Sequence, residues 1–340
     1  MAITRVIAGG YAEQGAEGLR LLQIDGDRFT RNDLVTPIVN VSAGVRIPTS
    51  SKWLFVDEAA GCVRLADASD EWRELASVPS GGEGPCHLAL DANATRVAAA
   101  NYDSGTVALF ELDAAHHPLT PPVLHQNRGH GPDPDRQESA HAHWVGFGPD
   151  GRLYVADLGI DQLLAFRVPG AASPLAEPAP VLRAPPGSGP RQLAFHPRLP
   201  IAYLVSELAS TLTVLSIDDE RFAVGQTLST LPDDFAGESL GGAIALRPDG
   251  RRLYVSNRGH NSVATFALDA KGQATLLGHS SCGGSSPRYL LLLPDQQRLL
   301  VAHEEEGGVT LLPVDADGLP QRPADRADVP GAAFLGLVPD

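Results

Sequence analysis

The side chains of this chain that are best suited to acid–base and anion chemistry stand at one repeated place in the sequence. His143, Arg191 and Arg288 each precede the turn position of a recurring motif by six residues. An imidazole exchanges a proton near neutral pH, and a guanidinium offers a planar fork that fits a carboxylate or a phosphate. A site built from these three residues could bind an anion and move a proton beside it.

The same place in the other copies of the motif is occupied by Cys86, Gly242 and Ala333. Equivalent positions of stacked repeats point the same way at the same height, so we expect the histidine and the arginines to converge near the mouth of a central channel. The alternative is that each arginine bridges neighbouring repeats. The sequence leaves the direction of these side chains open.

A second set of polar residues follows the second strand of each copy, on the same rim. Its members are Asp57, Asn101, Asp157, Glu207, Asn257 and His303. Side chains of this kind commonly cap their own turn, which is the alternative to a role in the site. We expect Asn101, Asp157 and Asn257 to contact the substrate.

The longest insertion on this rim is LHQNRGHGPDPDRQESAHAH, residues 124–143. Long loops in compact folds are often functional lids, and the alternative is a mobile surface loop. His141 and His143 would share one face of a strand, as metal ligands can. No third ligand of suitable spacing stands out, and the two arginines would repel a cation. We therefore predict no metal and no cofactor, and expect His141 to contact the substrate.

The element that must position these residues is a repeat of four strands. Each copy has an apolar strand, a Pro/Asp/Gly turn, a β-rich strand, a polar turn and an alternating strand. The turn prolines, residues 149, 197, 248, 294 and 339, stand 45 to 51 residues apart. This spacing is typical of the blades of a β-propeller.

Two further blades complete the count. Residues 44–75 form a degenerate copy, and the last blade is split, with its first strand in 331–340 and its later strands in 3–25. We therefore predict an all-β fold, a seven-bladed β-propeller with four-stranded antiparallel blades, in which residues 1–340 are a single domain closed by the two termini. The Pro- and Ala-rich segment 170–189 is predicted to connect two blades.

Composition excludes several classes of function. The chain of 340 residues has 26 basic and 41 acidic residues, a net charge of −15, which argues against nucleic acid as a partner. It has no run of about 18 apolar residues and begins without an apolar leader segment. We expect a cytoplasmic protein that avoids membranes and is a monomer or a weak homo-oligomer.

The known sequence signatures of other sites are missing. The three cysteines, Cys62, Cys86 and Cys282, are widely spaced and form no CxxC pair, so neither a disulfide framework nor a zinc site is expected. The chain has no Walker P-loop, no GxSxG, no HExxH, and no GxGxxG between a strand and a helix.

Several motifs together carry a family resemblance. They are GPCHLAL with ANYDSGTV (84–107), GHGPDPDRQESAHAH (129–143), DLGID (157–161), GPRQLAFHP (189–197), SELAST (206–211), LPDDFAGE (231–238) and SNRGHNSV (256–263). With these motifs in this order, the chain resembles the seven-bladed lactonase family of bacterial 6-phosphogluconolactonases, which is related in fold to fungal carboxy-cis,cis-muconate cyclases.

The resemblance implies hydrolysis of a sugar lactone, or reversible lactonisation as in the fungal branch, without a metal. Family members place a histidine, two arginines and a glutamate in the cleft, and by motif these are His143, Arg191, Arg258 and Glu207. The chain departs from the family at Gln192, where a histidine is expected. It departs again at SAGVRIP (42–48), which replaces an asparagine–proline–serine entry. These departures leave the natural substrate open.

The leading hypothesis is a metal-independent lactonase that acts on a small anionic sugar lactone, phosphorylated or acidic. His143 is the candidate general base, because it is the only group nearby whose ordinary pKa is close to neutrality. Arg191, Arg258 and Arg288 would bind the anion and the oxyanion, and Glu207 would orient an arginine or the water. The alternatives are a non-catalytic propeller that binds a small anion or a protein, and a muconate-type cycloisomerase.

Overall fold

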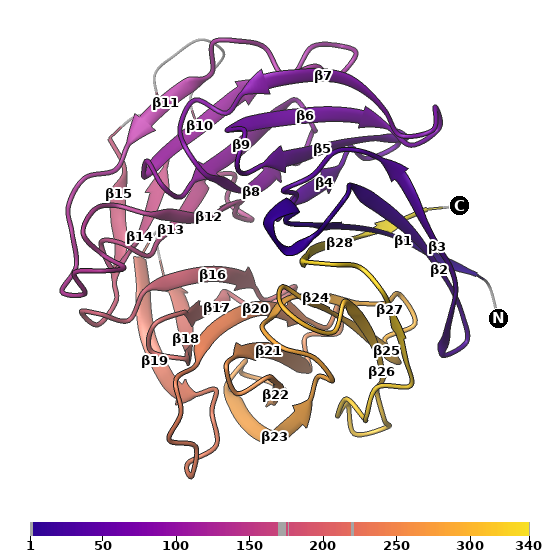
Figure 1. Cartoon of the computed structure of the whole chain (residues 1–340). Helices are drawn as coiled ribbons and strands as arrows, with labels where there is room; N and C mark the ends of the chain where they lie inside the picture. Colours follow the sequence, from indigo (N-terminus) through magenta and orange to yellow (C-terminus); the bar gives the residue numbers. More distant parts are fainter. Residues whose placement is uncertain (1–2, 169–174, 176, 219–220, 340) are drawn as a thin grey trace. The chain divides into compact units, whose positions relative to one another are not determined.

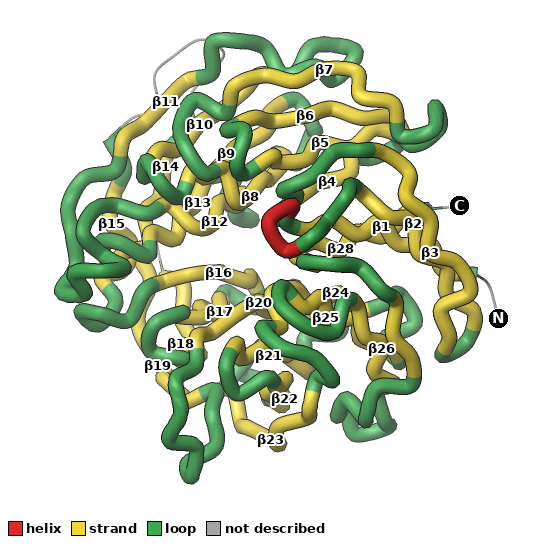
Figure 2. The backbone as a smooth tube through the Cα atoms, in the orientation of Figure 1, coloured by secondary structure: helices red, strands yellow, loops and turns green. Residues whose placement is uncertain are grey.

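The computed structural model describes residues 3–168, 175, 177–218 and 221–339. These residues form seven four-stranded antiparallel sheets. The helical structure of the described part is one 3-10 turn, η1 (Ala12–Gln14), drawn in red in Figure 2. Two compact units are present, residues 40–191 and residues 1–39 with 192–340, and each is described by itself. The prediction of a single domain stays a prediction.

The unit of residues 40–191 contains three of the sheets, in the order of the chain. Their strands are β4 (Gly44–Arg46), β5 (Lys52–Asp57), β6 (Cys62–Asp67) and β7 (Arg73–Pro79); β8 (Pro85–Leu90), β9 (Arg96–Asn101), β10 (Thr106–Glu111) and β11 (Val123–Gln126); and β12 (Ala142–Phe147), β13 (Leu153–Asp157), β14 (Gln162–Phe166) and β15 (Ala179–Arg183). In each sheet every strand pairs with the next one along the chain (Figure 1).

The other unit contains four sheets. Three of them follow the same order: β16 (Pro190–Phe195), β17 (Ile201–Ser206), β18 (Thr211–Asp218) and β19 (Arg221–Ser229); β20 (Leu240–Leu246), β21 (Arg252–Arg258), β22 (Ser262–Leu268) and β23 (Ala274–Ser281); and β24 (Pro287–Leu292), β25 (Arg298–His303), β26 (Val309–Pro313) and β27 (Asp325–Ala327). The boundary between the units falls within β16.

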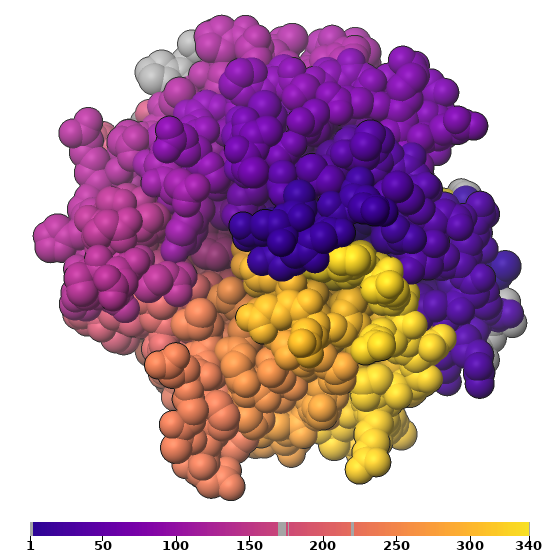
Figure 3. Space-filling view, in the orientation of Figure 1, coloured from indigo at the N-terminus to yellow at the C-terminus, as the bar shows by residue number. Residues whose placement is uncertain are grey.

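The fourth sheet of this unit joins the two ends of the chain. Its strand order is β28 (Ala332–Val338), β1 (Thr4–Gly10), β2 (Leu19–Asp25) and β3 (Arg28–Thr36). β28 and β1 are antiparallel, and the Tyr11 amide donates to the Gly331 carbonyl at 3.0 Å. Figure 3 shows the two terminal segments, in indigo and yellow, packed against each other. The predicted split blade is therefore confirmed.

Burial explains the sequence pattern of the strands. The second strand of a blade is buried on both faces, as in IAYLVS of β17 and LYVAD of β13, so it shows no alternation. The outer strands keep one face in solvent, and β23 has exposed Leu276 and Leu277. Apolar clusters fill the space between neighbouring blades; one packs Tyr203 and Val205 with Val255 and Phe266.

The Pro-Asp-Gly turns join the first and second strands of a blade, and bonds from nearby tyrosines hold neighbouring blades together at the same end as these turns. Gly250 has φ +67°, and a Cβ there would lie 2.5 Å from Nε2 of His196, so a glycine is required. The hydroxyl of Tyr203 donates to the carbonyl of Gly272 in the next blade at 2.9 Å. Tyr254 donates to Gly318 in the same way and at the same distance. These two buried bonds tie the blade of β17 to that of β22 and the blade of β21 to that of β26.

The sheets confirm the fold class, a seven-bladed β-propeller with four-stranded antiparallel blades. One expectation was wrong. The segment 170–189 is more than a connection, because it contains the outer strand β15, in which Pro180 stands opposite Leu164. A proline is tolerated there, since an edge strand leaves one side of its backbone unpaired. Residues 169–174 and 176 of this segment lie outside the described residues. No helix in the described part is long and apolar enough to cross a membrane.

Candidate active site

The first set of predicted site residues coincides with a backbone irregularity. The pairing of the first and second strands of a blade shifts register by one residue at the shared position, and the residues there are Cys86, His143, Gly242, Arg288 and Ala333. A β-bulge of this kind turns a side chain away from the normal alternation of the strand. The bulge is therefore the local feature that makes the side chains at these positions depart from the in–out alternation of their strand.

The second set of predicted residues is buried, and most of its members serve their own turns. Asp57, Asn101, Asp157, Asn257 and His303 are each at most 3% exposed. Asn101 donates to the Thr106 hydroxyl at 3.0 Å. Asn257 donates to the Thr230 carbonyl at 2.7 Å and accepts from the hydroxyl of the same residue at 2.7 Å. The bond of Asn101 to Thr106 supports the turn-capping alternative, whereas Asn257 bonds a residue of the preceding blade. Substrate contact by these two asparagines stays a prediction.

Asp157 is the most constrained member of this set. Its carboxylate accepts hydrogen bonds from the amides of His141 (2.8 Å) and Gly159 (3.0 Å) and from the side chain of Asn127 (2.7 Å). Burial raises the pKa of this carboxyl above its ordinary value, against these hydrogen bonds, which lower it. Asp157 thus fixes the backbone immediately before His143, and its predicted contact with the substrate stays a prediction.

Two histidines and a tyrosine gather in the unit of residues 40–191. The ring of Tyr102 stacks on the ring of His141 at 4.5 Å and meets the ring of His143 edge-on at 5.4 Å. His141 places Nδ1 2.9 Å from the Tyr102 carbonyl and Nε2 3.1 Å from Oε1 of Glu138. Both partners of His141 accept hydrogen bonds, so this histidine is held on both nitrogens. His143 is 9% exposed. These contacts favour neither histidine for proton exchange, and the role of His143 as the base stays a prediction.

The loop that leads to these histidines is anchored along its length. The two ends of the insertion predicted at residues 124–143 belong to strands β11 and β12, so the loop itself consists of residues 127–141. Gln137 is fully buried and donates to the Leu158 carbonyl at 2.8 Å. The Asp133 carboxylate accepts from the amides of Asp135 and Arg136 at 3.0 and 3.1 Å. These bonds support neither the lid nor the mobile loop expected from the sequence.

Arg191 lies near another histidine of the same unit, the half-buried His87. Arg191 is 6% exposed. Loss of hydration and, to a smaller extent, the charge of Arg191 together lower the pKa of His87 to about 3. The ring of His87 contacts the ring of Trp144 at 5.7 Å, and its Nδ1 has no hydrogen-bond partner. A neutral His87 adds no second positive charge beside Arg191.

The second cluster, in the unit of residues 1–39 and 192–340, is built on Arg258. Its Nη2 lies 2.5 Å from Oε2 of Glu207, and the two side chains are 11% and 2% exposed. Nη2 also donates to the Gly241 carbonyl at 3.4 Å, and Nε of Arg258 has no hydrogen-bond partner. Glu207 thus reaches a side chain of a neighbouring blade, as Asn257 and Asp157 reach Thr230 and Asn127. The structure brings these two predicted residues together.

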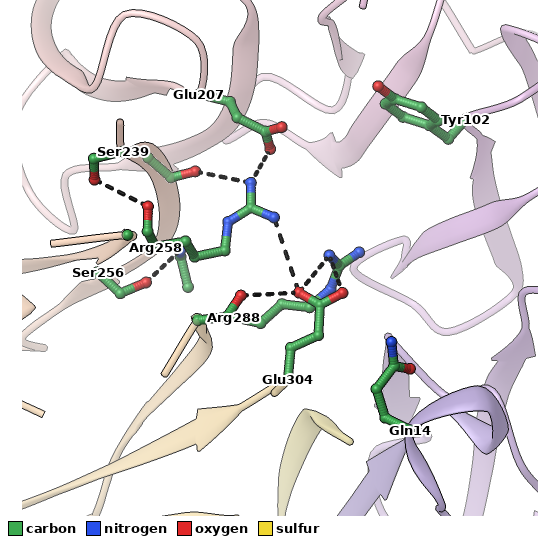
Figure 4. A network of polar contacts seen from close by, with 12 residues as sticks. Gln14, Tyr102, Glu207, Ser239, Ser256, Arg258, Arg288 and Glu304 are labelled. Atoms are coloured by element: carbon green, nitrogen blue, oxygen red, sulfur yellow. Dashed lines mark hydrogen bonds and ion pairs between the residues drawn. The ribbon is translucent and has the colours of Figure 1, made fainter. Parts of the chain in front are cut away.

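Arg288 joins the same cluster through a residue that the sequence analysis did not single out. Glu304 lies between the two arginines, 3.2 Å from Nη1 of Arg288 and 4.0 Å from Nη1 of Arg258 (Figure 4). Its Oε2 also accepts from the Ser286 hydroxyl at 3.3 Å. The guanidinium of Arg288 lies over the ring of Tyr11 at 5.1 Å, a cation–π contact. Two guanidiniums and two carboxylates thus form one network.

A metal centre is not apparent in the described ranges, where no group of three His, Cys, Asp or Glu side chains is arranged to hold an ion. The catalytic role of His143 and the substrate contacts of the other residues stay predictions at this point.

Comparison with known proteins places the chain in a family. The sequence model "Lactonase, 7-bladed beta-propeller" matches residues 5–335. The chain belongs to this lactonase family. A 6-phosphogluconolactonase of Bacillus subtilis is 31% identical over 320 residues, which cover 91% of this chain and 90% of the relative. An uncharacterized protein of Lactococcus lactis is 34% identical over 317 residues, 91% of each chain.

Two solved structures match 99% of this chain. A protein from Lactobacillus plantarum superposes with a TM-score of 0.90 at 28% identity and covers 99% of this chain and 100% of its own. The periplasmic gluconolactonase of Pseudomonas aeruginosa gives a TM-score of 0.89 at 27% identity, with 99% of each chain covered. The resemblance predicted from the motifs is confirmed at the level of the family.

Proposed function

We propose that this protein hydrolyses a sugar lactone that carries a phosphate or a carboxylate, of which 6-phosphogluconolactone is the leading candidate. The observation that carries the proposal is the buried pair of Arg258 and Glu207, joined through Glu304 to Arg288. Guanidiniums held in fixed positions bind an anionic group or a developing oxyanion with little reorganisation. Membership of the lactonase family and the name of the Bacillus relative support the same reaction class.

The proposed chemistry begins with a water molecule that attacks the lactone carbonyl carbon. In this proposal His143 takes the proton of that water, and Arg191 stabilises the negative charge that develops on the carbonyl oxygen. The ring C–O bond then breaks, and the proton held by His143 passes to the leaving oxygen. The product is the open hydroxy acid, and the side chain is restored for the next turnover.

Arg258 has a different role in the proposal, as the group that binds the remote anion. Glu207, 2.5 Å away and almost fully buried, orients its guanidinium. Because the contact is to a part of the substrate that does not react, it should affect binding more than the chemical step. Arg258→Ala should therefore raise KM for charged lactones, while KM for uncharged lactones should change little. Equal losses on both substrates would remove this role from Arg258.

The direct test is a lactone-opening assay on purified protein, corrected for spontaneous hydrolysis. Ring opening releases a proton, so the reaction can be followed with a pH indicator on a phosphorylated and an uncharged sugar lactone. We expect turnover that depends on protein concentration. Tight binding of the lactone without turnover would favour the binding-only propeller, and turnover of a muconate-type diacid alone would favour the cycloisomerase.

A further inference from the structure

Glu304 is the shared partner of both arginines in the cluster. Its carboxylate lies 3.2 Å from Nη1 of Arg288 and 4.0 Å from Nη1 of Arg258. Figure 4 shows the Arg258 guanidinium between Glu304 and Glu207, so each carboxylate contacts a different side of it. The Ser286 hydroxyl donates to Glu304 and helps to hold it between the two guanidiniums.

The two carboxylates of this cluster differ in how they meet the solvent. The side chain of Glu207 is 2% exposed, and that of Glu304 is 21% exposed. Arg258 and Arg288 are intermediate, at 11% and 14%. Glu207 is therefore the buried counterion that fixes Arg258, and Glu304 is the partner that an incoming molecule can reach and displace.

Charge compensation has a consequence for anion binding. The formal charges of the two arginines and the two glutamates cancel, so the cluster as a whole presents no excess positive charge. An anionic group that binds Arg258 or Arg288 must compete with Glu304 for the same N–H donors, whereas the hydroxyl of an uncharged sugar can donate to the Glu304 carboxylate. Selectivity is the difference between these two affinities.

We propose that Glu304 is a positioning and specificity-determining residue. It competes with a substrate anion for Arg258 and Arg288 and so lowers the affinity of the site for that anion. It thereby sets how strongly the site distinguishes phosphorylated from uncharged sugar lactones. The inference rests on the proposed lactonase activity and deepens it. It concerns how strongly the site prefers a phosphorylated to an uncharged sugar lactone, a preference set in part by one carboxylate.

The test compares Glu304→Gln with the matched control Glu305→Gln. Both changes remove one negative charge from the same turn, but Glu305 is exposed and only Glu304 bridges the arginines. The readout is kcat/KM for 6-phosphogluconolactone divided by that for gluconolactone. Glu304→Gln should raise this ratio about tenfold, mostly through KM, because one uncompensated positive charge now faces the phosphate. Glu305→Gln should change the ratio less than about twofold.

Glu304→Asp separates charge from geometry, since it keeps the charge and should keep the wild-type ratio within about threefold. Equal ratios in wild type, Glu304→Gln and Glu305→Gln would overturn the proposal. Calorimetric binding of the two product acids, gluconate and 6-phosphogluconate, gives the same comparison without turnover. A wild-type protein that opens neither lactone would refute the proposed function, while a shift in product selectivity confined to Glu304→Gln would still support the role of Glu304.

Discussion

Replacing Glu207 by glutamine removes the negative charge nearest to Arg258 and leaves the shape of the site almost unchanged. The two charged groups are 2.5 Å apart at their closest atoms, and both side chains are nearly buried. With charge centres about 4 Å apart and an effective dielectric constant of about 20, their attraction is about 4 kcal/mol. Removal of one partner from a buried ion pair costs about 3–5 kcal/mol when the other charge is left unpaired. Arg258 keeps Glu304 at 4.0 Å after this change, so we expect the lower end of this range.

This energy can be converted into a shift of the thermal midpoint. An unfolding entropy of about 2.1 cal/mol/K per residue gives about 0.7 kcal/mol/K for this chain, so a loss of about 3 kcal/mol lowers Tm by about 4 °C. Calorimetry of Glu207→Gln, Arg258→Met and the double variant measures the coupling. We expect the double variant to lose about 2 kcal/mol less than the sum of the single variants.

The chain supplies a matched control for this cycle. Arg73 and Asp70 also approach to 2.5 Å, but their side chains are 65% and 54% exposed. Arg73→Met with Asp70→Asn should therefore show a coupling below about 0.5 kcal/mol, as exposed pairs do. If the buried pair couples no more strongly than this surface pair, then Glu207 does not hold Arg258 and the argument for a pre-arranged guanidinium fails.

Other changes test separate parts of the structure. His143→Ala should lower kcat by about 10²–10⁴-fold with a much smaller effect on KM, and full activity on charged and uncharged lactones would exclude it as the base. Activity should survive dialysis against EDTA, and a loss restored by a divalent cation would show a metal that the sequence did not predict. Deletion of residues 331–340 removes β28 and its buried Phe334 and Leu335, so no soluble folded protein is expected, since stabilities are about 5–15 kcal/mol. Burial lowers the pKa of His303 to about 4, so between about pH 6.5 and pH 4 the unfolded chain binds a proton on this side chain and the folded chain does not. The free energy of unfolding should therefore fall by up to roughly 3 kcal/mol as the pH falls through this window. The fall should be smaller in His303→Asn.

The sequence predicts the strands and the blades well, because buried and half-buried strands differ in their apolar pattern and the turns repeat. It fails at β15, where APVLR is short and contains a proline that only an edge strand accepts. It also leaves the loop of residues 127–141 open, because the bonds that anchor it, such as that of Gln137 to Leu158, join residues far apart in the chain.

The candidate site is predicted in part. Alignment of the repeats finds the positions of His143 and Arg288, but the bulge that turns them depends on strand register and has no composition signal. Glu304 escapes notice because it belongs to the run Glu304–Glu305–Glu306, which looks like a solvated acidic turn. In that blade the member of the second polar set is His303, the residue before Glu304. Its ring bonds the Thr310 hydroxyl at 3.0 Å and takes no part in the network of the two arginines. A search for a carboxylate beside the aligned position would have found it.

The bulge at the start of five of the blades also bears on how such a protein can change. A bulge is made by the backbone, so the residue that occupies it can vary while the strands on both sides keep their register. Ala333 and Cys86 hold such positions but are only 1% and 7% exposed, and Cys86 packs in an apolar cluster, so a larger side chain at either position must displace its neighbours. Gly242 is more restricted still, because a Cβ would lie 2.3 Å from the Ser256 hydroxyl. The bulge positions are therefore unequal as places for new side chains, and a designer of altered specificity would begin at Arg288, which is partly exposed.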